Sequence, residues 1–266
     1  MMKLYFRKYG NGPPLVLLHG LYGSSDNWVT IAKKLSDTFT VFLPDQRNHG
    51  RSPHSDVHDY NSMRDDLHEL VIDLALKKFF LAGHSMGGKT AISFALKWPE
   101  MINGLLIADV SPFTNEAVRA SSSSHHSEIL NAILSFDPGR ITARGEAEKA
   151  LTETIPSEKI RELILKNLQR TDSGKYNWKF NPVSLQNNLN KIIEGIERPV
   201  DYSLRITGFP VIFLRGADSD HIPPGDISDI LNIFPAAEIV EIAGAGHWIN
   251  ADQPDEVVKY LRRLLI

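Results

Sequence analysis

The sequence predicts an α/β fold with a mostly parallel central sheet, helices on both faces of that sheet, and one helical insertion. Short, almost continuously apolar segments alternate with amphipathic patterns along the first half of the chain. Strands covered by helices on both faces have this composition, and their alternation with helices is typical of parallel sheets. The second observation is that this alternation is interrupted: it stops after Asp109 and resumes near Pro210.

The expected strands of the first half are residues 14–18, 40–43, 78–82 and 104–108. A helix is expected over residues 63–74, where apolar side chains recur at helical spacing and charged side chains occupy the other faces. After the interruption we expect strands at residues 210–214 and 238–242. A final helix is expected over residues 254–265, since the proline at its start suits the first helical turn.

The interruption contains no strand-like segment and reads as helical. Its three helical patterns lie at residues 129–134, 160–168 and 185–196. Polar stretches at residues 121–124 and 169–179 are expected to be loops. We therefore expect one core domain, residues 1–111 and 206–266, interrupted by a helical cap, residues 112–205.

Composition excludes several classes of function. The chain has 266 residues, a net charge of −3 and no cysteine, so disulfides, thiolate metal sites and a cysteine nucleophile are excluded. Basic residues are scattered, which argues against a nucleic-acid partner. Residues 1–9 lack the apolar run of a signal peptide, and other apolar runs are too short to span a bilayer. We expect a cytoplasmic protein without a membrane partner; the oligomeric state is not indicated.

A serine nucleophile is predicted at Ser85. The segment Gly-His-Ser-Met-Gly, residues 83–87, follows an expected strand and opens a helical stretch. This is the G-x-S-x-G nucleophile elbow in its required context, a sharp turn between a strand and a helix. Glycines two residues either side of the serine leave room for the crowded turn. The helix N-terminus favours negative charge that develops near the serine.

A serine hydroxyl needs a general base, and His247 is the best-placed candidate. It lies in Gly-Ala-Gly-His-Trp, residues 244–248, after the last expected strand. The glycines of this segment suggest a loop bent to aim the imidazole. His125 and His126 have no carboxylate or third ligand at metal-site spacing and are interpreted as the solvated start of a helix, so no metal and no cofactor are expected.

Two backbone N–H groups are expected to form an oxyanion hole. Leu21 lies in the glycine-containing loop at residues 19–23, directly after the first expected strand, which is the position of a donor loop in such enzymes. Met86 follows the nucleophile and would supply the second donor.

The acid that orients the histidine has three candidates from position alone. Asp109 follows one strand, and Asp218 and Asp220 follow another.

These segments closely resemble the α/β-hydrolase family. The matches run in order through His19-Gly20, residues 45–52, the elbow at Ser85, and residues 244–248. They leave only the insertion, which is similar to the variable cap of that family. The resemblance implies an α/β-hydrolase fold and a Ser-His-Asp triad.

The position of the acid departs from the usual pattern of that family. The family usually places its acid in G-x-x-D-x-x-x-P, but here Ser219 occupies the acid position between Gly216 and Pro223. The small YbfF-like esterases instead have the acid in a D-x-x-P context after the strand before the cap, which Asp109 and Pro112 resemble. That resemblance favours Asp109 over Asp218 as the acid, with Ser219 in a supporting position.

The implied activity is that of a serine carboxylesterase or thioesterase acting on small to medium acyl esters, including acyl-CoA thioesters, through an acyl-enzyme. The partner would be a small-molecule ester or thioester. C–C bond hydrolases and perhydrolases carry the same three residues and are the alternative reactions. A ligand-binding protein that has lost catalysis is a third reading, disfavoured because such proteins commonly lose the serine or histidine, and this chain has both.

Overall fold

The computed structural model describes residues 2–197 and 205–266 and has a seven-stranded sheet at its centre. The strand order is β1-β3-β2-β4-β5-β8-β9. Strand β1 is antiparallel to β3, and every other neighbouring pair is parallel. The strands are β1 (Phe6–Tyr9), β2 (Pro14–Leu18), β3 (Thr40–Pro44), β4 (Phe79–His84), β5 (Ile102–Ala108), β8 (Val211–Gly216) and β9 (Glu238–Ile242).

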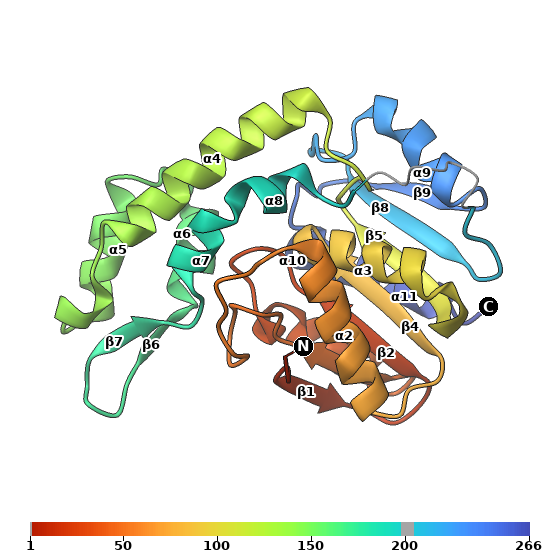
Figure 1. The fold of residues 1–266 in the computed structure, drawn as a ribbon, viewed down its shortest axis with the longest axis horizontal. Helices are drawn as coiled ribbons and strands as arrows, with labels where there is room; N and C mark the ends of the chain where they lie inside the picture. The colour runs from red at the N-terminus through yellow and green to blue at the C-terminus, as the bar shows by residue number, and fades with distance from the viewer. Residues whose placement is uncertain (1, 198–204) are drawn as a thin grey trace.

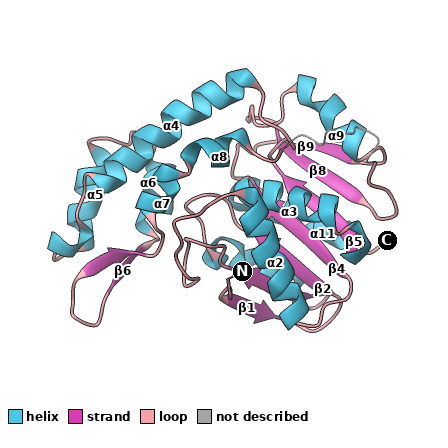
Figure 2. Ribbon diagram, in the orientation of Figure 1, coloured by secondary structure: helices cyan, strands magenta, loops and turns pink. Residues whose placement is uncertain are grey.

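Helices cover both faces of this sheet, as Figures 1 and 2 show. One face packs against α2 (Tyr60–Asp73), α3 (Met86–Lys97) and α9 (Ile227–Ile233) through one apolar cluster. The other face packs against α1 (Val29–Leu35), α10 (Ile249–Asp252) and α11 (Pro254–Arg263) through a second cluster. The central strands are therefore buried on both sides, which explains their almost uninterrupted apolar sequences. The predicted α/β fold is confirmed.

Between β5 and β8 the chain forms an arch of helices beside the sheet (Figure 1). Its helices are α4 (Glu116–Leu134), α5 (Arg144–Thr152), α6 (Glu158–Leu165), α7 (Pro182–Asn187) and α8 (Leu189–Glu194). They share an apolar cluster of their own, which Tyr22 of the core joins. The division into core and cap stays a prediction, and residues 198–204 of the expected cap lie outside the described residues.

Three local expectations were wrong. Residues 121–124 are not a loop but lie within α4, where the Asn115 side chain caps the helix and Leu130 and Ile133 are fully buried. For the same reason His125 and His126 lie in the middle of a helix, not at its start. Residues 169–179 were expected to be a loop, yet β6 (Leu168–Arg170) and β7 (Tyr176–Trp178) pair there as an antiparallel hairpin.

Strand β1 was not expected at all. It is an edge strand paired only with β3, and its mixture of charged and apolar residues fits a strand that is covered incompletely.

The fold also indicates where on the sheet a ligand would bind. The carboxyl ends of β2, β4, β5, β8 and β9 lie along one edge of the sheet, beside the helical arch (Figure 1). In open α/β sheets this edge is where ligands bind.

Candidate active site

Ser85 lies in the sharp turn between β4 and α3. Its φ is 53° and its ψ is −120°, a backbone conformation that side-chain-bearing residues rarely adopt. A Cβ atom on Gly83 would lie 2.2 Å from the carbonyl oxygen of Gly87, and one on Gly87 would lie 2.5 Å from the carbonyl oxygen of Leu18. The turn can therefore close only with glycine at both positions, as the sequence motif suggested.

His247 contacts Ser85 with one ring nitrogen and Asp109 with the other. The Ser85 hydroxyl lies 3.0 Å from Nε2, and Nδ1 lies 2.8 Å from Asp109 Oδ2. With Nδ1 protonated, the ring donates to the carboxylate and Nε2 accepts from the serine. Burial, with a smaller contribution from His221, lowers the pKa of His247 well below its ordinary value. A neutral imidazole is the form that can accept a proton.

Asp109 is fully buried at the end of β5, also with a positive φ, 52°. The Ser219 hydroxyl donates to Oδ2 at 2.5 Å, and the backbone N–H of Gly216 donates to Oδ1 at 2.9 Å. Burial raises the pKa of the Asp109 carboxyl, while the hydrogen bonds from Ser219 and Gly216 oppose that rise because they stabilise the charged form. Both carboxylate oxygens are thus held, and one of them faces His247.

The other two candidates for the acid lie apart from His247. Asp218 and Asp220 are exposed, and no hydrogen bond or ion pair links either side chain to His247 in the described part of the chain. The backbone N–H of Asp218 instead bonds to the carbonyl oxygen of Ala245. Among the predicted candidates, the structure brings Asp109 and Ser219 to the histidine and leaves Asp218 at the surface.

The loop after β2 closes over Ser85 from the other side. A Cβ atom on Gly20 would lie 3.3 Å from Ser85 Cβ and 2.9 Å from His84 Nδ1, so the loop backbone lies against the elbow. Leu21 and Met86 line the same cavity as Ser85. The N–H of Met86 is at the first position of α3, where a helix leaves its N–H groups without intrahelical acceptors. Both predicted donors therefore lie beside the serine.

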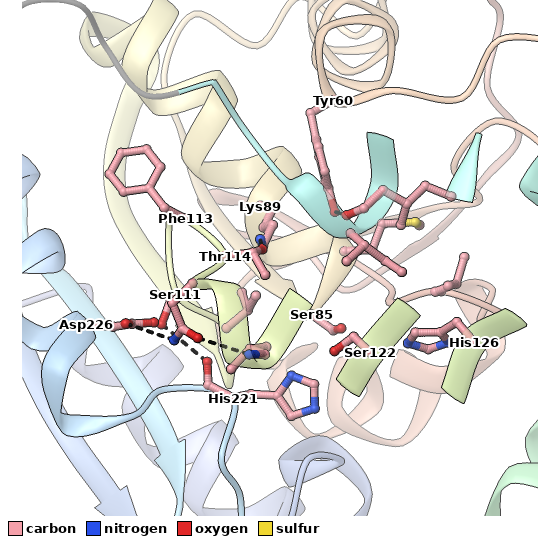
Figure 3. A pocket seen from close by; sticks show the side chains of 17 residues that line it. Tyr60, Ser85, Lys89, Ser111, Phe113, Thr114, Ser122, His126, His221 and Asp226 are labelled. Atoms are coloured by element: carbon pink, nitrogen blue, oxygen red, sulfur yellow. Dashed lines mark hydrogen bonds between the residues drawn. The ribbon is translucent and has the colours of Figure 1, made fainter. Parts of the chain in front are cut away.

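Two cavities meet at Ser85. The larger, of about 340 Å³, runs between the core and the helical arch, and its apolar wall includes Trp28, Ile129, Leu163 and Trp248. The smaller, of about 70 Å³, is drawn in Figure 3. It has a more polar wall, including Lys89, Thr114 and Asp226.

Sequence reasoning missed two residues of this site, His221 and Lys89. The His221 ring stacks on His247, with centroids 3.6 Å apart and planes inclined by 18°. Its position two residues after Ser219 was a usable signal. Lys89 is almost fully buried although its side chain is ionisable, and its place four residues after Ser85, in the first turn of α3, was a usable signal.

Neither a metal centre nor a membrane-spanning helix is found in residues 2–197 and 205–266. No cluster of three or more histidine or acidic side chains there has the arrangement of a metal site. No helix there has the length and apolar character needed to cross a bilayer.

Comparisons with known proteins find relatives of similar sequence and a solved structure of similar fold. The chain is 37% identical over 247 residues to the sn-1-specific diacylglycerol lipase ABHD11 of Danio rerio, covering 92% of this chain and 76% of the relative. It is 30% identical over 255 residues to esterase YbfF of Escherichia coli, covering 96% and 94%. A solved structure titled marine microorganism esterase superposes with a TM-score of 0.94 at 42% identity, covering 99% of this chain and 100% of that one.

A family profile described as alpha/beta hydrolase fold matches residues 13–254. That span includes the elbow, the helical arch and the loop that carries His247. With relatives at 30% identity or more along almost the whole chain, the family is established. This protein belongs to the α/β-hydrolase fold family.

Proposed function

We propose that this protein is a serine esterase whose catalytic triad is Ser85, His247 and Asp109. The observation that supports it most directly is the continuous chain of hydrogen bonds from the serine hydroxyl through the imidazole to the buried carboxylate. Serine, base and orienting acid in this geometry are the requirements for acyl transfer. Relatives named esterase and lipase support an ester bond as the target.

In the acylation step His247 Nε2 accepts the hydroxyl proton while Ser85 Oγ attacks the ester carbonyl carbon. The negative charge that develops on the carbonyl oxygen is stabilised by the N–H groups of Leu21 and Met86. The protonated imidazole, stabilised by Asp109, then gives its proton to the departing alkoxide, and an acyl-enzyme remains.

Water resolves the acyl-enzyme by the same route. His247 accepts a proton from the water molecule, the hydroxide adds to the acyl carbon, and the proton returns to Ser85 Oγ as the carboxylic acid leaves. A thioester would follow these steps with a thiolate as leaving group. The larger cavity, with its apolar wall, can hold a medium acyl chain or an apolar leaving group.

The test is hydrolysis of p-nitrophenyl acetate, butyrate and octanoate by the purified protein and by Ser85→Ala, with acetyl-CoA and octanoyl-CoA as thioester probes. Replacement of the nucleophile is expected to lower kcat by about 10⁶-fold. A fluorophosphonate probe should label the wild type at Ser85 and leave Ser85→Ala unlabelled.

Two results would contradict the proposal. One is a wild type inactive on every ester and thioester, which would bring forward the C–C hydrolase and ligand-binding alternatives. The other is a Ser85→Ala variant that keeps its rate, which would move the nucleophile elsewhere. Circular dichroism of both proteins is the control for folding.

A further inference from the structure

A lysine lies buried beside the serine in the smaller cavity. Lys89 lies in the first turn of α3, four residues after Ser85, which is the N-cap residue of that helix, and its backbone N–H bonds to the carbonyl oxygen of Ser85 at 3.0 Å. The residue is only 5% exposed, and its side chain lines the cavity that also contains Ser85 and Met86. Figure 3 shows Lys89 and Ser85 around this common space.

The ammonium group has few partners in the described part of the chain. Nζ donates a hydrogen bond to the Thr114 hydroxyl, but an ammonium carries three N–H donors and no acceptor. No carboxylate of residues 2–197 or 205–266 forms an ion pair with it. Asp226, which lines the same cavity, accepts a hydrogen bond from Asn115 Nδ2 at 3.3 Å. Figure 3 places Asp226 at the far end of the cavity from Ser85.

A buried cation with incomplete pairing is unfavourable. Burial lowers the pKa of Lys89 to about 7, and Asp226 only partly opposes that change. Buried charges in proteins are normally paired. The backbone of Gly195 closes one side of the group, since a Cβ atom there would lie 2.4 Å from Nζ. The cavity thus holds a fixed donor that an anionic ligand would complement.

Size restricts what such a ligand can be. The cavity of about 70 Å³ is well below the volume of about 150 Å³ that accepts benzene in an engineered protein core. It has room for a group of a few heavy atoms. A carboxylate meets the requirement because it is small, accepts hydrogen bonds only, and forms charge-assisted bonds with an ammonium.

We propose that Lys89 binds a carboxylate of the substrate, so that the preferred substrates are short esters with a carboxylate a few atoms from the scissile carbonyl. This inference rests on the proposed function, since the same serine would attack the ester. The smaller cavity would hold the charged group, and the larger apolar cavity would hold the other side of the ester. Lys89 is then a residue that determines specificity.

The test uses two ester pairs of matched shape, with kcat/KM measured by titration of the released acid. Monomethyl succinate carries the carboxylate on the acyl side, and methyl levulinate replaces it with a methyl ketone. Acetoxyacetate carries the carboxylate on the alcohol side, and acetoxyacetone is its ketone counterpart. The variant is Lys89→Met, which keeps the chain length and removes the charge. The matched control is Lys97→Met, at the exposed end of the same helix.

The wild type is expected to prefer at least one carboxylate ester over its ketone counterpart. In Lys89→Met that preference should fall by about 10- to 100-fold, mainly through KM, as expected for a lost charge-assisted bond. Lys97→Met should keep the preference within about twofold, because exposed ion pairs contribute little. The pair that responds identifies the side of the ester that enters the smaller cavity.

The proposal fails if the wild type prefers both ketones, a result that does not depend on whether any variant folds. It also fails if Lys89→Met keeps the preference. A Lys89→Met protein that loses activity equally on all four esters and melts at a lower temperature would give Lys89 a structural role and overturn the inference.

If the ketone esters are hydrolysed in a Ser85-dependent way and the carboxylate esters are not, only the inference is lost. If no ester is hydrolysed, the proposed function is lost as well.

Discussion

The loops after β5 and β8 differ in what they contribute to the site, although they follow neighbouring parallel strands. Ala108 at the end of β5 is in register with Leu214 near the end of β8, so both loops reach the same edge. The first contributes Asp109, which is fully buried, and the second contributes Ser219 and His221, while Asp218 and Asp220 are exposed. Equivalent positions on a sheet edge therefore do not make two carboxylates equivalent.

Burial and hydrogen bonding distinguish the two loops. Asp109 receives the Ser219 hydroxyl and the Gly216 N–H, both from the β8 side, and contacts the imidazole with the same oxygen that Ser219 holds. The loop after β5 thus supplies the carboxylate, and the end of β8 and the loop after it supply the groups that donate hydrogen bonds to it. Three predictions test this division of roles.

The largest effect is expected from Asp109→Asn. An amide cannot stabilise the imidazolium and favours the wrong tautomer of His247, so kcat should fall by about three to four orders of magnitude. Steady-state hydrolysis of p-nitrophenyl acetate measures it. The matched control is Asp218→Asn, which should retain the wild-type rate within about twofold. A reversal of these two results would place the acid on the β8 loop.

A smaller effect is expected from Ser219→Ala. Its hydroxyl stabilises the charged form of Asp109, so its loss should raise the pKa of that carboxyl further above the ordinary value. The carboxylate is then protonated at a higher pH, and activity should disappear earlier as pH falls. We expect kcat to drop about tenfold at pH 7, as for a lost hydrogen bond to a charged group. A pH–rate profile whose acidic limb does not move would refute this role.

The smallest effect is expected from removal of the ring that stacks on His247. His221→Ala should lower kcat several-fold, roughly what the loss of an aromatic contact costs. His221→Phe keeps a ring in that position and should restore most of the activity. If the two variants are equally impaired, the imidazole of His221 has a role beyond packing. The ratio of kcat values for the two variants is the measurement.

The parts of the site that sequence could predict are those specified locally. The elbow needs glycine at two fixed positions around Ser85, because the backbone of Gly87 occupies the space of a side chain on Gly83, and the backbone of Leu18 occupies that of one on Gly87. The strands before it are apolar because both faces are covered. Both features can be recognised from a few neighbouring residues, so the strands and the serine could be named in advance, as could His247, which follows two glycines.

Other features depend on contacts between distant segments. Serines at residues 121–124 suggested a loop, but α4 continues through them because Leu130 and Ile133 bury against other helices of the arch. The β6–β7 hairpin and the edge strand β1 are also set by pairing rather than by composition. Lys89 and His221 lie close in the sequence to Ser85 and Ser219, but they were missed because that closeness does not show which cavity a side chain faces.

The sequence by itself determined the α/β class, and it indicated the serine of the elbow, the histidine and a short set of acids at one sheet edge. Only the tertiary structure decided which carboxylate is buried against His247, which hydroxyl holds it, and that a lysine lies beside the serine. The physical reason is that a strand or an elbow is specified by nearby residues. Desolvation and pairing of a charge depend instead on segments that meet only after folding.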